Sequence, residues 1–170
     1  MGFDKDILNK QAQHWENAFS STQEMFGASP SVAAIKASEA FKKEGVANIL
    51  ELGAGQGRDT LYFAKEGFHI HALDYSKTGI DNITEKSKTL KLDNLITGEI
   101  YDVRNSLPID DKKFGGCFSH MLYSMAFTSK ELECLSNEIH RVLKDGGINI
   151  YTARHTKDTD YKNGIHRGEE

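Results

Sequence analysis

The sequence has few of the residues that cross-link or interrupt a small protein. Its 170 residues include two cysteines and two prolines. Cys117 and Cys134 stand in apolar segments without a C-x-x-C spacing, so we expect two reduced core cysteines and no disulfide. A chain of 170 residues is long enough for one domain with its own hydrophobic core and too short to expect two.

Long apolar runs and blocks of like charge are also missing. No stretch approaches the roughly 18 apolar residues of a membrane span, and Met1 to Asp6 contain no apolar core of a signal peptide. Lys and Arg number 21 against 25 for Asp and Glu, a formal net charge of -4. This balance indicates neither nucleic acid nor a membrane as a partner, and we expect a cytoplasmic protein.

One stretch combines an apolar run with closely spaced glycines. Val46 to Leu52 is short and apolar, as expected of a strand buried on both faces of a parallel sheet. Gly53, Gly55 and Gly57 follow; they lack the Cβ atoms that would keep a ligand from the backbone, and they permit positive φ. Thr60 to Glu66 is typical of a helix. Strand, glycine loop and helix together predict a site for a nucleotide-type ligand.

The spacing of the glycines separates the possible ligands. The dinucleotide motif G-x-G-x-x-G needs its third glycine where this sequence has Arg58. A P-loop needs G-K-[ST], which does not follow. The pattern Glu51-x-Gly53-x-Gly55-x-Gly57 resembles the first motif of the class I S-adenosylmethionine-dependent methyltransferases. In that family the glycine loop passes beside the methionine part of the cofactor, and the leading acid helps to position it.

A second strand is expected from Phe68 to Asp74, where alternating residues end in an acid. A carboxylate at this strand end can accept both ribose hydroxyls of an adenosine. Asp74 follows Gly53 by 21 residues, close to the offset of about 20 in dinucleotide enzymes, so it supports adenosine rather than methyl transfer in particular. His69 and His71 share a strand face without a third ligand nearby, so we expect surface or edge histidines and no metal.

The remaining strands follow in order. Leu95 to Tyr101 indicates a third strand, and the family resemblance implies that Asp102 accepts the adenine amino group while the backbone of Val103 meets the ring. Phe114 to His120 indicates a fourth strand, although its two glycines depart from the family pattern. A Leu-Lys-Asp-Gly-Gly turn then leads into a fifth strand at Ile148 to Tyr151.

The N-terminal segment places Leu8, Trp15 and Phe19 at the spacing of an amphipathic helix. In the family such a segment often folds over the cofactor and substrate as a lid, in which case Gln13, His14 and Trp15 face the site. Simple packing on the domain is the alternative.

Two further helices have clear signals. Ser29 followed by proline predicts a helix from Pro30 to Lys43 that buries Val32, Ile35 and Phe41. The run Thr128-Ser129-Lys130-Glu131 matches a capping box, and apolar residues follow it at helical spacing.

Strands alternating with helices predict an α/β fold, a Rossmann-like doubly wound parallel sheet of the class I methyltransferase type with five strands. We divide a single domain, 1–170, into a candidate lid (1–29), a cofactor-binding core (30–154) and a polar tail (155–170). The tail is too short for the helix and antiparallel strand pair that complete the family fold. We therefore expect a fragment or shortened form whose fifth strand is an exposed edge, open to pairing in a homodimer unless the tail covers it.

The resemblance implies S-adenosyl-L-methionine as the cofactor, without a metal. The expected cofactor-binding residues are Glu51, Gly53, Ala54, Gly55, Gly57, Arg58, Asp74, Tyr75, Ser76, Asp102, Val103 and Ser119. Within the family, the segments 57–60 and 151–154 resemble the tellurite-resistance and thiopurine methyltransferase branch.

The expected function is methyl transfer to a small-molecule acceptor. The family supplies no single catalytic residue; the candidates past strand ends are His120, Tyr123, Arg154 and His155, each weighed against a place in the pocket wall or on the surface. Arg154 is suited to pairing with an anionic acceptor. The alternatives are a nucleotide-dependent oxidoreductase and a non-catalytic module that binds the cofactor.

Overall fold

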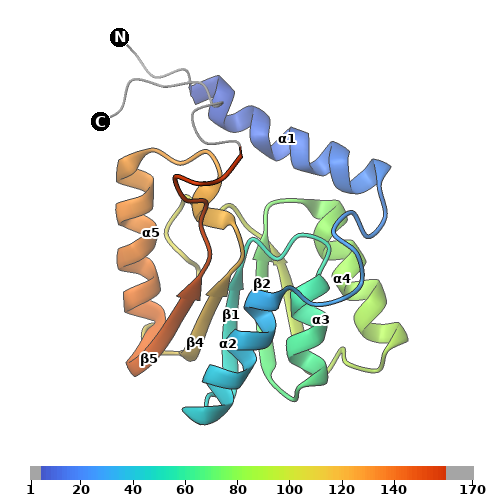
Figure 1. Ribbon diagram of the computed structural model, residues 1–170, viewed down its shortest axis with the longest axis vertical. Coiled ribbons are helices and arrows are strands. Elements are labelled where there is room, and N and C mark those ends of the chain that lie inside the picture. Colours follow the sequence, from blue (N-terminus) through green and yellow to red (C-terminus); the bar gives the residue numbers. More distant parts are fainter. Residues whose placement is uncertain (1–4, 160–170) are drawn as a thin grey trace.

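The structure is a computed structural model that describes residues 5–159 (Figure 1). Side chains are described from residue 10 onward, so Leu8 of the predicted apolar stripe lies outside them, as do residues 160–170 of the expected polar tail. In chain order the elements are α1 (Lys5–Ser21), α2 (Val32–Lys43), β1 (Asn48–Leu52), α3 (Arg58–Lys65), β2 (His69–Asp74), α4 (Lys77–Thr89), β3 (Ile96–Ile100), β4 (Phe114–Ser119), the 3-10 helix η1 (Leu122–Ser124), α5 (Ser129–Val142) and β5 (Leu143–Tyr151).

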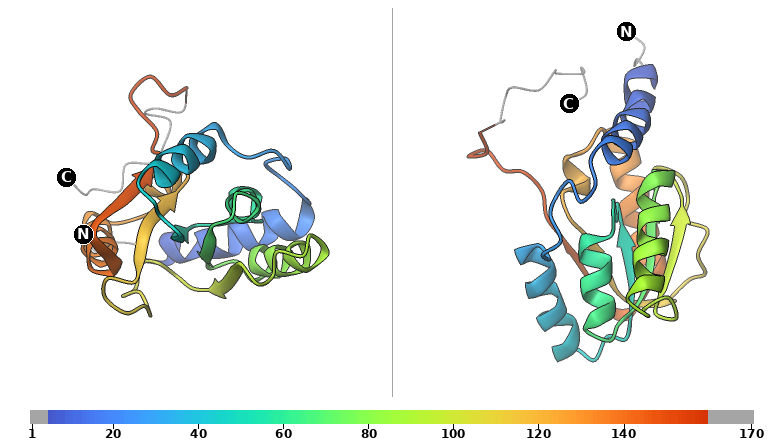
Figure 2. Two further views of the ribbon diagram at one scale, coloured as in Figure 1. Left: turned by 90° about the horizontal axis from the view of Figure 1, so that it is seen from below. Right: turned by 90° about the vertical axis from the view of Figure 1, so that its right-hand side faces the viewer.

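The five strands form one sheet in the order β3-β2-β1-β4-β5, and every neighbouring pair is parallel. Helices α2, α3 and α4 cover one face, and α5 covers the other (Figure 2). This arrangement confirms the predicted doubly wound α/β fold. Because all strands run the same way, their carboxyl ends meet at one edge of the domain, where open α/β sheets bind ligands.

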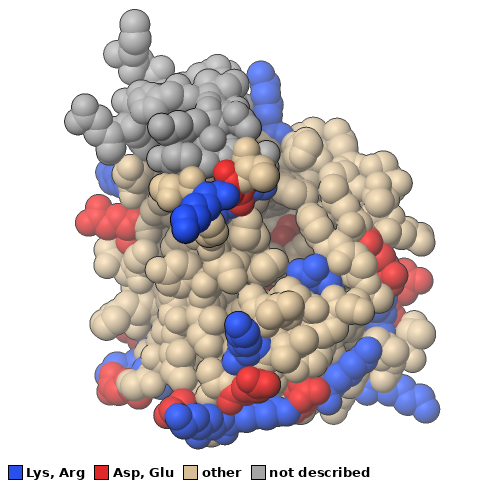
Figure 3. Space-filling model, in the orientation of Figure 1, with Lys and Arg blue, Asp and Glu red and all other residues tan. Residues whose placement is uncertain are grey.

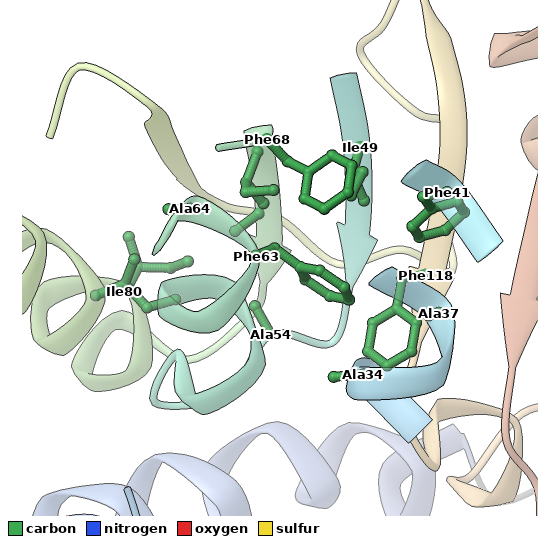
Figure 4. Packing of buried hydrophobic residues seen from close by; sticks show 13 residues of the cluster. Ala34, Ala37, Phe41, Ile49, Ala54, Phe63, Ala64, Phe68, Ile80 and Phe118 are labelled. Atoms are coloured by element: carbon green, nitrogen blue, oxygen red, sulfur yellow. The ribbon is translucent and has the colours of Figure 1, made fainter. Parts of the chain in front are cut away.

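The core on the first face is built from aromatic rings (Figure 4). Phe63 of α3 meets Phe118 of β4 edge to face, with ring centroids 5.0 Å apart. Phe41 of α2 packs above β4, where a Cβ on Gly116 would lie only 2.7 Å from the Phe41 ring. Gly116, one of the two glycines that depart from the family pattern, therefore makes room for the Phe41 ring.

The core on the second face joins the sheet to α5. Leu50 and Leu52 point to this face, whereas Ile49 points to the first, so β1 is buried on both sides as predicted. Cys117 is buried here as expected. The expectation for Cys134 is wrong: it is exposed, because it lies on the outward face of α5.

The buried face of α2 also differs from the prediction. Val32 is 69% exposed and Ile35 37%, while the helix buries Ala34 and Ala37. Ser31 rather than Ser29 caps the helix and accepts a hydrogen bond from the Ala34 N–H. The buried residues Ala34, Ala37 and Phe41 follow at the spacing of one helix face, and Val32 and Ile35 lie away from that face. The small side chains of Ala34 and Ala37 let the first half of α2 approach the sheet closely, while Val32 and Ile35 turn outward. Phe41 is buried as predicted.

The fifth strand is longer than expected and irregular. Phe114 of β4 pairs with Leu143, but Gly116 pairs with Ile148, so extra residues bulge out of β5 between these two pairs. Within residues 5–159, β5 forms one edge of the sheet and β3 the other.

No helix in that range is long and apolar enough to cross a membrane.

We predict that Gly116→Ala lowers the free energy of unfolding by about 1–3 kcal/mol, because the fully buried Phe41 ring cannot move away from the added methyl group. Gly115→Ala is the matched control, since its Cβ would meet Val46 at an ordinary 3.4 Å. Urea unfolding followed by circular dichroism measures both variants. Equal stabilities would contradict this account of the Gly116 position.

Candidate functional site

A cavity of about 920 Å³ lies at the carboxyl ends of the strands. Its walls come from the glycine loop, the residues that follow β2, β3 and β4, and one face of α1. Helix α1 crosses over these strand ends (Figures 1 and 2). On the face drawn in Figure 3, basic and acidic side chains are interspersed, without one extended patch of either sign.

The glycine loop adopts the predicted conformation. Gly53, Gly55 and Gly57 have φ of 71°, 56° and 83°, values that other residues rarely adopt. Gly53, Ala54 and Gly55 line the cavity. Gly57 lies outside the lining, and a Cβ there would come within 2.4 Å of Ile83, so it allows α3 to pack against α4.

Glu51 places a buried carboxyl group against the cavity. It is 3% exposed, and its Oε2 has no hydrogen-bond partner among the described residues. Burial, reinforced by the nearby Asp59 carboxylate, raises the pKa of Glu51 to about 8. The hydroxyls of Thr60 and Ser119 are likewise buried without a partner in the described part of the chain. Of these three residues, Glu51 lines the cavity, whereas Thr60 and Ser119 lie outside the lining. Unsatisfied buried carboxyl groups are rare in folded proteins, so Glu51 points to a polar ligand.

Asp74 ties the glycine loop to the start of α4. Its Oδ2 accepts the Gly55 N–H and its Oδ1 accepts the Ser76 N–H, both at 2.8 Å. Burial raises the pKa of Asp74, and the two backbone N–H groups act against that rise. Ser76 caps α4 and lies outside the cavity lining, while Tyr75 lines it.

Asp102 and Val103, the residues expected to meet an adenine, line the cavity past β3. Sequence reasoning missed Arg104, whose Nε lies 3.0 Å from each Asp102 oxygen. Burial favours the neutral acid, but the hydrogen bonds from Arg104 outweigh it and hold the pKa of Asp102 below its usual value. Arg104 therefore keeps this carboxylate ionised and fixes its orientation.

Helix α1 is fastened over the cavity at two points along its length. The Gln11 side chain accepts the Ala126 N–H at 3.0 Å. Glu16 accepts the Ser76 hydroxyl at 2.6 Å and also contacts Thr78. Trp15 lines the cavity together with Gln11 and Phe19, one helical turn to either side.

Two residues expected to face the site do not line the cavity. Gln13 bonds Asn17 on an exposed face of α1, and His14 is exposed and packs edge-on against Trp15. The prediction for Gln13 and His14 is therefore wrong, because neighbouring residues on a helix point in different directions.

The glycine loop also holds the segment between α1 and α2. Gln56 accepts the Met25 N–H at 2.9 Å. Arg58 donates to the Phe26 carbonyl at 3.1 Å. Asp59 accepts both the N–H and the hydroxyl of Ser31, at 2.7 and 2.8 Å. Polar residues between and after the glycines thus fix the chain that carries α1.

Of the four candidate catalytic residues, His120 lines the cavity. Tyr123 packs against Tyr151 with the two rings tilted and their centroids 4.6 Å apart, and it is absent from the lining. Arg154 pairs with Asp158, and both Arg154 and His155 are exposed outside the lining.

The described residues contain no cluster of three or more His, Cys, Asp or Glu side chains that could hold a metal ion. His69 is exposed as expected. His71 is less exposed than a surface histidine, because its Nε2 lies 3.0 Å from Glu99 Oε2 and its ring packs against Phe114.

The lining fits a ligand that combines a cation with an adenosine. Glu51 offers a buried carboxyl to a positive group, whereas Asp74 and Asp102, at the ends of the next two strands, offer acceptors to hydroxyl and amino groups. S-adenosylmethionine carries these groups.

Comparisons with known proteins agree with this chemistry. The family model described as a methyltransferase domain matches residues 49–147. Phosphoethanolamine N-methyltransferase 1 of Triticum aestivum is 38% identical over 121 residues, which span 69% of this chain and 22% of that protein.

Solved structures show the same fold. A candidate S-adenosyl-L-methionine-dependent methyltransferase from Methanococcus maripaludis has 22% identity and a TM-score of 0.62, covering 90% of this chain and 65% of that one. A second structure is geranyl diphosphate C-methyltransferase from Streptomyces coelicolor A3(2), solved with Mg²⁺, geranyl diphosphate and S-adenosyl-L-homocysteine. It has 18% identity and a TM-score of 0.57, and the match covers 69% of this chain and 46% of that one.

We predict that Glu51→Gln stabilises the ligand-free protein at pH 8.5 by on the order of 1–3 kcal/mol. Because the pKa of Glu51 is raised to about 8 from 4.5, the wild type is penalised increasingly as the pH rises between these values, and the neutral amide escapes this penalty. At pH 4.5 the two proteins should be nearly equal. Urea unfolding at both pH values measures the difference, with the exposed Glu133→Gln as control. A less stable Glu51→Gln at pH 8.5 would contradict the prediction.

Proposed function

The chain belongs to the class I S-adenosylmethionine-dependent methyltransferases, and from this premise we propose that it transfers the methyl group of S-adenosylmethionine to a small-molecule acceptor. The cavity carries the proposal, because it brings Glu51, Asp74 and Asp102 from three successive strand ends to one lining beside the glycine loop. The finer assignments below rest on the contacts of these residues.

We assign the methionine end of the cofactor to Glu51 and the glycine loop. Backbone at Gly53, Ala54 and Gly55 borders the cavity without large side chains, which allows close approach of a ligand. The ammonium group of the cofactor is a suitable partner for the unsatisfied Glu51 Oε2. A cation at this place favours the ionised carboxylate, so cofactor binding lowers the pKa of Glu51 and releases a proton near neutral pH.

We assign the adenosine end to the next two strand ends. Each Asp74 oxygen already accepts one backbone N–H and keeps a lone pair for a ribose hydroxyl. Asp102, held ionised by Arg104, accepts the adenine amino group, and Val103 and Tyr75 border the ring. Gly57, Ser76 and Ser119 lie outside the cavity lining. Gly57 and Ser76 act indirectly, through helix packing and helix capping.

The protein's contribution to such a reaction is alignment and exclusion of water. The cofactor brings an activated methyl group, and holding two reactants in line can supply about 7–11 kcal/mol of the barrier. Helix α1, fastened by Gln11 and Glu16, closes the cavity over the strand ends. The wheat relative is named for phosphoethanolamine and a structural neighbour for geranyl diphosphate, which supports a small organic molecule as the acceptor class.

A nucleotide-dependent oxidoreductase is disfavoured. Arg58 stands in the place of the third glycine of the dinucleotide motif, and its guanidinium donates hydrogen bonds to Asp59 and to the Phe26 carbonyl.

A non-catalytic module that binds the cofactor differs from the enzyme in one measurable way. Release of S-adenosylhomocysteine in the presence of an acceptor separates the two.

We predict that the chain binds S-adenosylhomocysteine and that Asp74→Ala weakens binding about 10- to 100-fold, the loss expected for hydrogen bonds to a charged group. Titration calorimetry measures this, with Asp81→Ala, on the exposed face of α4, as the control. Thermal unfolding of each variant checks that the fold persists. No binding at millimolar ligand, or equal binding by Asp74→Ala, would overturn the proposed function.

We also propose that β5 pairs with a second copy of the chain in a twofold dimer. The support is its edge position within residues 5–159, with Tyr151 55% exposed. Light scattering should give a dimer mass that falls on dilution, and Tyr151→Lys should shift it to the monomer by placing a charge at the edge. A concentration-independent monomer with a tail protected from proteolysis would rule the dimer out.

A further inference from the structure

The turn that follows β4 holds a histidine in a constrained position. Thr152 Oγ1 lies 3.0 Å from His120 Nδ1 and accepts the Met121 N–H at 2.8 Å. Met121 has φ of 63°, a left-handed conformation that costs free energy in a residue with a side chain. Thr152, anchored beside β4 through its own N–H to the Ser119 carbonyl, therefore fixes both the His120 ring and the strained residue after it.

This turn lies against the glycine loop. A Cβ on Gly53 would come within 3.1 Å of the Leu122 side chain, so the residues after β4 pack directly on the loop assigned to the methionine end of the cofactor. His120 lines the same cavity as Glu51 and Gly53. An acceptor seated next to the cofactor's methyl group thus meets this turn.

The wall on this side is apolar apart from Gln11 and His120. Helix α1 contributes Trp15 and Phe19, and the segment after β4 contributes Met121, Leu122, Met125 and Phe127. The Gln11 carbonyl is already committed to the Ala126 N–H. Among these described lining residues, His120 is the one that can exchange a proton near neutral pH.

We propose that His120 is the catalytic base of the methyl transfer and Thr152 its positioning residue, and that the acceptor has an apolar body bearing one O–H or N–H group. This inference rests on the proposed function. In the proposed arrangement the proton of His120 is on Nδ1, from where it donates to Thr152 Oγ1, whose other lone pair takes the Met121 N–H. That arrangement leaves the Nε2 lone pair available to the cavity. The competing arrangement has the Thr152 hydroxyl donating to Nδ1 and the proton on Nε2.

In the proposed step His120 Nε2 takes the proton of the acceptor, while the acceptor's oxygen or nitrogen forms a bond to the methyl carbon. The electron pair of the broken carbon–sulfur bond stays on sulfur, and the imidazolium later releases the proton to solvent. Burial lowers the pKa of His120; of the facing charged groups, Asp59 acts against this shift and Arg58 adds to it. This direction favours the neutral ring, which is the form that acts as a base.

The tautomer of His120 tests the inference without an acceptor. Nitrogen NMR of the protein bound to S-adenosylhomocysteine at pH 7 should show His120 neutral, with the proton on Nδ1. Thr152→Ser should keep this tautomer, and Thr152→Val should change it. A proton on Nε2 in the wild type, or an unchanged tautomer in Thr152→Val, would overturn the pairing.

Turnover tests the catalytic assignment and the acceptor class. We expect formation of S-adenosylhomocysteine with 4-methylphenol or 2-phenylethylamine to exceed that with phosphoethanolamine. His120→Asn should lower kcat about 100- to 10,000-fold, abolish the acidic limb of its pH profile, and leave the Kd of S-adenosylhomocysteine unchanged. His69→Asn, at an exposed histidine of β2, is the control.

The outcomes separate this inference from the proposed function. If the protein binds S-adenosylhomocysteine but turns over neither apolar probe, prefers phosphoethanolamine, or keeps its kcat in His120→Asn, the inference fails and the proposed function stands. If S-adenosylhomocysteine does not bind, the proposed function itself fails.

Discussion

The convergence of two backbone N–H groups on the Asp74 carboxylate is the interaction on which the site depends. It joins the glycine loop after β1 to the start of α4 after β2. The same turn carries Ser76, whose hydroxyl holds Glu16 and thereby α1. Because loop, helix α4 and the covering helix α1 are linked through this one acid, a change there alters both the binding surface and the closure of the cavity.

A second constraint is the accumulation of buried acids at one edge of the sheet. Glu51, Asp59 and Asp74 are all buried at this edge. Burial first, and then the nearby carboxylates of Asp59 and Asp74, raise the pKa of Glu51. Asp59 is satisfied by Ser31, so the unsatisfied group is Glu51. A cation bound beside Glu51 is therefore electrostatically favourable, which agrees with a sulfonium cofactor bearing an ammonium group.

How far the sequence predicts this molecule depends on the kind of pattern. The strands and the glycine loop were predictable, because burial on two faces and positive φ leave direct marks in residue type. The outward positions of Val32 and Cys134 were not predictable, because the elements packed against a helix decide which of its faces is buried. Gly116 shows the same limit, since only the Phe41 ring above it explains the missing side chain.

By itself the sequence determined the fold class, the family and the acids at three strand ends, because these follow from local spacing. Only the tertiary structure decided which side chains share the cavity. It removed Gln13 and His14 from the lining and placed Thr152 against His120. These contacts join residues by the rotation of a helix or the alignment of neighbouring strands, and such geometry arises only when the sheet is assembled.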